Sequence, residues 1–156
     1  MTEELVFERI LKDRKRYIRY NISHDKKSFL LVTRYTTGNY LEYKIHVKIM
    51  VNADTMTSEV LDKIEKESVK LFKKAYDFLD FRKTYQLIAI ILLLLVKYKI
   101  IKLKHLAVSK TVKISYYVIT KENARKTYNL KPDDFLNLIK KLDKFFKENK
   151  VYKETE

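Results

Sequence analysis

The stretch from Leu87 to Val96 reads LIAIILLLLV and contains no polar side chain. Any fold of this chain must therefore hide this segment from water. Leucine dominates over β-branched residues, which favours a helix over a strand. A helix of about twelve residues is about 18 Å long, whereas the hydrocarbon core of a bilayer is about 30 Å thick. Because Lys97 and Lys99 follow directly, we predict a buried central helix and no membrane span.

The size of the chain predicts one domain around this helix. A chain of 156 residues is long enough to bury a core without covalent staples. Gly and Pro each occur once, which leaves little room for linkers, so we expect a single compact domain over residues 1–156 with a frayed tail at 150–156. The absence of cysteine excludes disulfides and thiolate chemistry. The acidic, amphipathic start is unlike a signal peptide and predicts an intracellular protein.

The first segment, 2–20, has the apolar spacing of an amphipathic helix. Val6, Ile10 and Tyr17 fall on one side of a helical wheel. The opposite side would bear a basic ridge, made of Arg9, Lys12, Arg16 and Arg19. Such a ridge can follow phosphates, and a solvated helix face is the alternative interpretation.

Two β-hairpins are predicted next. Ser28–Thr36 and Tyr40–Val51 flank the turn at Gly38, and strict alternation along the second run predicts one buried face. A second hairpin is expected from 98–108 and 111–120, although the first of these runs could instead continue the central helix. Tyr98, Tyr116 and Tyr117 offer stacking surfaces there. This part of the chain is the most basic, with Lys97, Lys99, Lys102, Lys104, Lys110 and Lys113.

Two further helices are predicted on either side. Thr57 can cap a helix over 58–81, and Pro132 is suited to the first position of a helix ending near Lys147. The outer face of the second helix would be basic, with Lys140, Lys141, Lys144 and Lys147. The predicted fold class is α+β: two β-hairpins packed with four to five helices around the central hydrophobic helix.

The segment 120–144 resembles a helix-turn-helix. A short helix, a turn at Asn129 and the helix after Pro132 would follow one another, with small or apolar side chains between them. Asp133 and Asp134, however, would repel phosphates at the start of the reading helix. A plain helical hairpin is the alternative interpretation.

The tripeptide Glu42-Tyr43-Lys44 resembles the acidic-x-Lys element of metal-dependent nucleases. In such enzymes carboxylates hold Mg²⁺ and the lysine helps to activate water. Asp25 and Glu8 are the candidates for the second acid. Ordinary cross-strand pairing of Glu42 with Arg34 or a lysine explains the same residues. The histidines are scattered singly, and one glycine leaves no phosphate-binding loop.

The charge of the chain indicates its partner class. Lys and Arg number 34 against 20 Asp and Glu, giving a net charge of +14, and such a charge attracts polyanions. A lysine-rich surface with no specific partner is the alternative. We expect a small, non-enzymatic nucleic-acid-binding protein, with DNA favoured, phosphate contacts through the three basic sets above and no cofactor. A Mg²⁺-dependent nuclease is the second hypothesis, and an oligomer-forming structural protein is the third.

Overall fold

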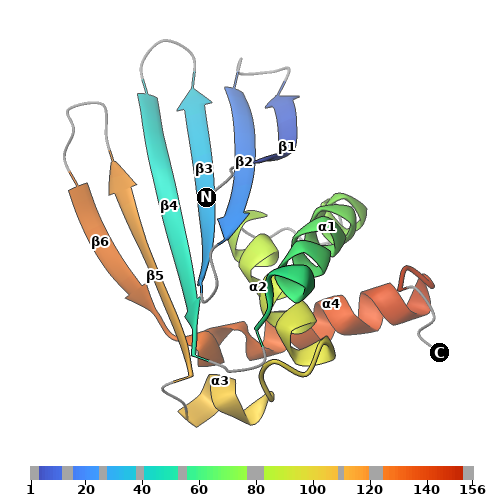
Figure 1. Ribbon diagram of the computed structural model, residues 1–156. Helices are drawn as coiled ribbons and strands as arrows, with labels where there is room; N and C mark the ends of the chain where they lie inside the picture. The colour runs from blue at the N-terminus through green and yellow to red at the C-terminus, as the bar shows by residue number, and fades with distance from the viewer. Residues whose placement is uncertain are drawn as a thin grey trace.

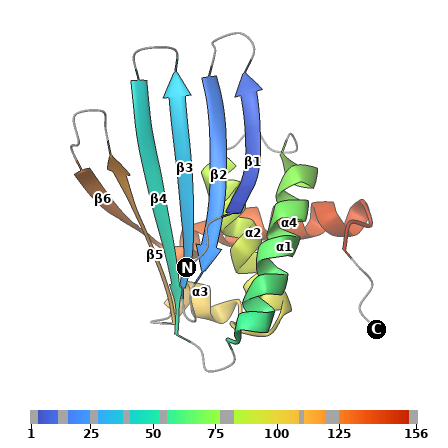
Figure 2. The same cartoon turned by 45° about the horizontal axis from the view of Figure 1, so that its top comes forward.

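The computed structural model describes residues 4–11, 16–24, 28–37, 41–52, 56–76, 83–108, 111–119 and 125–152, and most of the side chains from Val47 onward. A six-stranded antiparallel sheet forms one layer, and the helices pack against the lower part of one of its faces (Figures 1 and 2). In neither view does a helix of the described ranges lie over the other face of the sheet. The fold is therefore α+β, as the sequence predicts.

The strands follow one another in space in the order of the chain, β1-β2-β3-β4-β5-β6. Each pairs with its neighbours in antiparallel register, and one bulge interrupts the first pair between Leu5 and Phe7. The helices α1, α2 and α3 lie between β4 and β5 in the chain, yet β4 and β5 are neighbours in the sheet. The chain therefore leaves the sheet after β4, forms these helices and returns beside β4 as β5. The strands are β1 (Glu4–Leu11), β2 (Arg16–His24), β3 (Ser28–Thr37), β4 (Leu41–Val51), β5 (Val112–Ile119) and β6 (Arg125–Leu130).

The helices form the second layer. The helix α2 packs against both α1 and α4, and the short α3 lies below the lower end of the sheet beside the 3₁₀ turn η1 (Figure 1). They are α1 (Ser58–Ala75), α2 (Lys83–Lys97), α3 (Lys104–Val108), η1 (Pro132–Phe135) and α4 (Leu136–Glu148). None of the helices in the described ranges is long and apolar enough to cross a membrane.

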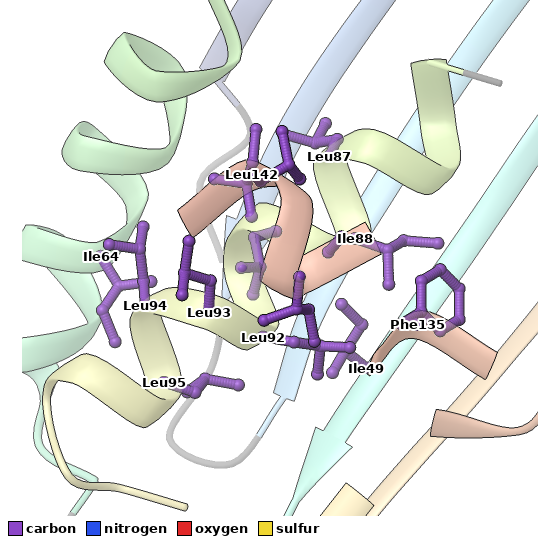
Figure 3. Close-up of a cluster of buried hydrophobic side chains, with 14 of the residues drawn as sticks. Ile49, Ile64, Leu87, Ile88, Leu92, Leu93, Leu94, Leu95, Phe135 and Leu142 are labelled. Carbon is purple, nitrogen blue, oxygen red and sulfur yellow. The ribbon is translucent and has the colours of Figure 1, made fainter. Parts of the chain in front are cut away.

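The core is centred on α2 (Figure 3). Every residue from Gln86 to Leu95 is buried, because α1 and α4 contact the helix and the inner face of the sheet contributes Val47 and Ile49. Phe135 and Leu142 close the core from the C-terminal segment. The predicted role of the apolar stretch as a core helix is confirmed.

The helix ends are stabilised by local contacts. The Thr57 hydroxyl accepts a hydrogen bond from the backbone N–H of Val60 at 3.2 Å, as an N-cap does. At the end of α2, Ile100 N–H donates to the Leu95 carbonyl at 2.9 Å, and Lys99 adopts a left-handed φ of 61°. The same arrangement recurs after α4, where Lys150 has φ of 50°. Both are Schellman caps with lysine where glycine is usual.

Several sequence predictions are confirmed. The hairpin of Ser28–Thr36 with Tyr40–Val51 is present as β3 and β4, although its turn at 38–40 lies outside the described residues. Val47, Ile49 and Val51 are buried while Lys48 and Met50 are exposed, as the alternation predicts. The helices predicted at 58–81 and 132–147 are found as α1, which ends at Ala75, and as η1 with α4.

Other predictions are wrong. The segment 2–20 contains β1 and the start of β2 in place of a helix, because pairing between strands determines its conformation. The run 98–108 is not a hairpin strand: it forms the cap of α2 and then α3. The helix-turn-helix, and equally the helical hairpin, is excluded because β6 replaces the first helix and pairs with β5. The frayed tail expected at 150–156 is not tested as a whole: Val151 and Tyr152 are half-buried against the core, and 153–156 lie outside the described residues.

Candidate functional site

We call the helix-free surface of the sheet the open face, and basic side chains occur on three of its strands, β4, β5 and β6. Its described side chains come from alternate positions on β4, β5 and β6, opposite in direction to the buried Val47, Ile49 and Ile114. No carboxylate occurs among these described side chains. They are Lys48, Met50, Lys113, Ser115, Tyr117, Arg125, Thr127 and Asn129.

One line of residues across the open face is strongly cationic. Arg19 on β2 lies opposite Arg34 on β3, and Arg34 lies opposite Lys44 on β4. Lys44 is followed by Ile119 on β5 and by Arg125 on β6. We call Arg19, Arg34, Lys44 and Arg125 the cationic row. Directly opposed positions in an antiparallel pair share a face, about 5 Å apart, and like charges there destabilise the sheet.

Carboxylates adjoin this row at two positions. Glu8 on β1 lies opposite Arg19 at one end of the row, and Glu42 lies two residues from Lys44 on the same strand, opposite Thr36. Three neighbouring positions of like charge nevertheless remain in the middle of the sheet. The row therefore has more positive than negative charge.

The predicted N-terminal ridge does not exist as one helical face. Arg9 lies on β1, Arg16 and Arg19 lie on β2, and Lys12 falls outside the described residues. Arg9 is opposite Ile18, whereas Arg19 is opposite Glu8. Because neighbouring opposed pairs alternate between the two faces of a sheet, Arg9 and Arg19 belong to opposite faces. Of this set, only Arg19 joins the cationic row.

The second predicted set is divided between elements. Lys113 lies exposed on the open face, opposite Met50. Lys99, Lys102 and Lys104 are exposed around the end of α2 and the start of α3, and Lys110 lies outside the described residues.

Lys97 belongs to a local cluster that fixes the C-terminal segment. Its Nζ lies 3.7 Å from the centroid of the Tyr152 ring and 4.0 Å from Asp143 Oδ1. The Tyr152 hydroxyl donates to Asp143 Oδ1 at 2.7 Å, and Lys147 Nζ lies 3.0 Å from Asp143 Oδ2. Partial burial opposes ionisation of Asp143, but these hydrogen bonds and the two lysine charges outweigh it and hold its pKa below the ordinary value.

The cluster has a consequence for the predicted binding residues. Lys97 and Lys147 both face Asp143, so part of their charge is balanced within the protein. Lys144 lies 3.8 Å from Glu148 on the surface of α4. Lys140 and Lys141 are exposed on the same helix, which belongs to the helix layer and not to the open face (Figure 2).

The residues of the acidic-x-Lys hypothesis are only partly brought together. Glu42 and Lys44 occupy alternate positions on β4, whereas Glu8 lies on β1, three strand spacings or about 14 Å away. Asp25 lies outside the described residues. Lys44 is opposite Arg34, so Arg34 is a diagonal neighbour of Glu42, as the alternative interpretation of cross-strand pairing requires. Within the described ranges, no three His, Asp or Glu side chains gather as a metal site would require.

Comparisons of the chain with protein-family models, with curated proteins and with solved structures find no match. The function is therefore inferred from the residues of this chain.

Sequence reasoning missed most of the residues of the open face. Arg34, Lys48 and Arg125 were not predicted to bind, and Lys44 was considered only for a nuclease. Alternation along each strand is the sequence signal that could have found them, because each lies on the strand face opposite to the buried positions. Alternation does not show which residues of different strands are neighbours, because that depends on the register. The helix predicted for 2–20 also prevented the prediction of β2.

Proposed function

We propose that this protein binds nucleic acid through the open face of its sheet, mainly by contacts to phosphates. The observation that supports the proposal is the opposition of Arg19, Arg34 and Lys44 on three adjacent strands. Like charges in direct opposition reduce the stability of a sheet. A bound polyanion would offset that repulsion, and binding would release counterions as it does in other basic proteins.

The exposed lysines near the row extend the same surface. Lys48 and Lys113 lie on the open face with no described carboxylate between them and Arg125. In contrast, Lys97, Lys144 and Lys147 each lie within 4.0 Å of an acidic oxygen. The charges of these three lysines are therefore partly balanced within the protein.

A salt titration with matched variants tests this proposal. We would measure the affinity for a labelled oligonucleotide, as single strand and as duplex, between low and moderate salt. The triple variant Arg19→Ala, Arg34→Ala, Lys44→Ala should bind more weakly. It should also lower the slope of log affinity against log salt by about 0.7 to 0.9 for each phosphate that the variant no longer neutralises.

The control removes the same charge from α4. The triple variant Lys140→Ala, Lys141→Ala, Lys144→Ala should retain most of the affinity and slope of the parent protein. A greater loss from the α4 variant than from the sheet variant would contradict the proposed surface. Absence of salt-dependent binding by the parent protein at low salt would overturn nucleic-acid binding itself.

Magnesium-dependent nuclease activity is a weaker second proposal. It is favoured only by the alternate positions of Glu42 and Lys44 on β4. Degradation of DNA in the presence of Mg²⁺ by the parent protein, and its loss in Glu42→Ala, is the expected outcome. Equal degradation by both proteins would exclude Glu42 as a metal ligand.

A further inference from the structure

The pair Tyr117 and Arg125 forms the one aromatic–cation contact that we find on the described part of the open face. Arg125 Cζ lies 4.0 Å from the centroid of the Tyr117 ring. Arg125 is exposed and Tyr117 is half-buried. Tyr117 lies opposite Thr127, so Arg125 approaches the ring along the diagonal of the strand pair. A flat ring and a flat cation are therefore presented together at the surface.

A similar pair on the other face of the same strands has a different environment. Lys126 Nζ lies 5.4 Å from the Tyr128 ring, and Tyr128 stacks on Tyr116 with centroids 4.8 Å apart. Tyr116 packs against the hydrophobic core. The tyrosines of the inner face thus stack on each other, whereas the ring of Tyr117 lies against the Arg125 guanidinium.

Cationic positions surround Tyr117 on the open face. Its direct neighbour on β4 is His46, so Lys44 and Lys48 are its diagonal neighbours there, and Arg125 is a diagonal neighbour on β6. Diagonal positions are about 7–8 Å apart. A ligand whose flat groups and negative charges alternate at short intervals matches this arrangement.

We propose that the open face selects single-stranded nucleic acid, with a base stacked at the Tyr117–Arg125 pair and the adjoining phosphates at Lys44 and Lys48. This inference rests on the proposed function and names its ligand. Bases of a single strand can turn a flat face to a tyrosine ring or a guanidinium, whereas bases of a duplex are stacked on each other. Aromatic rings stack on any base, so little dependence on base sequence is expected.

The experiment compares a single-stranded 12-mer with the duplex of the same sequence, using DNA and RNA probes. The parent protein should bind the single strand at least about fivefold more tightly than the duplex. Tyr117→Ser should weaken single-strand binding about tenfold, the effect of removing one stacked base, and should weaken duplex binding by less. Tyr117→Phe keeps the ring and should bind as the parent does.

Adjacent positions on β6 supply matched controls that do not depend on Tyr117→Ser folding. Arg125→Ala and Lys126→Ala each remove one exposed cation, but only Arg125 lies on the open face. Arg125→Ala should weaken single-strand binding severalfold, and Lys126→Ala by less than twofold. Arg125→Lys keeps the charge but not the planar group, so it should keep the salt slope while its affinity for the single strand falls.

The outcomes separate this inference from the proposed function. Equal affinity for single strand and duplex, or equal effects of Arg125→Ala and Lys126→Ala, would overturn the stacking site. If the stacking site is overturned but the triple variant of Arg19, Arg34 and Lys44 still binds more weakly than the parent, the proposal of phosphate binding by the sheet remains supported. If no variant of the sheet affects binding, both proposals fail.

Discussion

At the scale of single residues, the position of Arg34 distinguishes function from stability. Arg34 lies between Arg19 and Lys44 on neighbouring strands, and opposed like charges cost about 0.2 to 1 kcal/mol. Arg34→Gln should therefore raise the free energy of unfolding by a few tenths of a kcal/mol at low salt, and the gain should shrink as salt screens the charges.

Urea unfolding at two salt concentrations measures this effect. Lys63→Gln provides the control, because Lys63 lies 3.6 Å from Glu59 on α1 and its removal should lower stability slightly. A lower free energy of unfolding in Arg34→Gln at low salt would contradict the arrangement of the cationic row.

Asp143 provides a residue-scale prediction about pH. Its pKa is lowered in the folded protein, so its contribution to stability is present above the unfolded pKa of about 3.9. That contribution is lost as the pH falls through the lower, folded pKa. Asp143→Asn should cost about 1 kcal/mol at neutral pH, and the difference from the parent protein should diminish below about pH 4.

Urea midpoints of both proteins at about pH 7 and about pH 3, on either side of the unfolded pKa, test this prediction. Glu148→Gln is the control, because Glu148 is exposed and its partner Lys144 lies 3.8 Å away, and it should change stability little at either pH. An undiminished difference between Asp143→Asn and the parent in acid would show that the carboxylate charge is not the cause.

At the scale of elements, the two helix caps that use lysine offer a prediction. Lys99 holds a φ of 61°, a conformation that costs an L-residue about 1 kcal/mol and glycine almost nothing. Lys99→Gly should therefore raise the free energy of unfolding by about 0.5 to 1 kcal/mol. The control Lys141→Gly, at an exposed helical position of α4, should lower it by about 1 kcal/mol. Destabilisation by Lys99→Gly would contradict the cap geometry.

The elements also show how far the sequence predicts this fold. Helices with local signals were predicted well: Thr57, Pro132 and the run Leu87–Val96 each act within their own segment. The strand β1, the first part of β2 and the start of β6 were predicted as helix, because short apolar runs fit both periodicities. Their conformation depends on pairing with distant partners, which no local pattern encodes.

The candidate site was harder to predict than the core for the same reason. The apolar stretch identifies α2 as core by its composition alone, and α2 is buried on every side. The cationic row exists only through the register of four strand pairs, and Arg34 shows no distinguishing feature in the sequence. Net charge predicts a polyanionic partner, which stays a proposal, but the placement of the charge on one face depends on the fold.

At the scale of the whole molecule, the helix layer contains the core helix and the sheet provides the proposed binding surface. The helix layer contains the buried helix α2 and packs against Ile49 and its neighbours on the inner face of the sheet (Figure 3). The sheet keeps its other face free of helices (Figure 2). Basic side chains occur on both layers. Glu8 and Glu42 adjoin the cationic row of the sheet, and two lysines of α4 lie close to acids.

A chemical-shift titration of the isotope-labelled protein with a single-stranded oligonucleotide tests the central claim, that the open face is the binding surface. We predict that the largest amide shifts occur in β4, β5 and β6, at Lys48, Lys113, Ser115, Tyr117 and Arg125, with α4 nearly unchanged. Shifts confined to the α4 lysines or to residues 99–104, or no shifts at low salt, would contradict it.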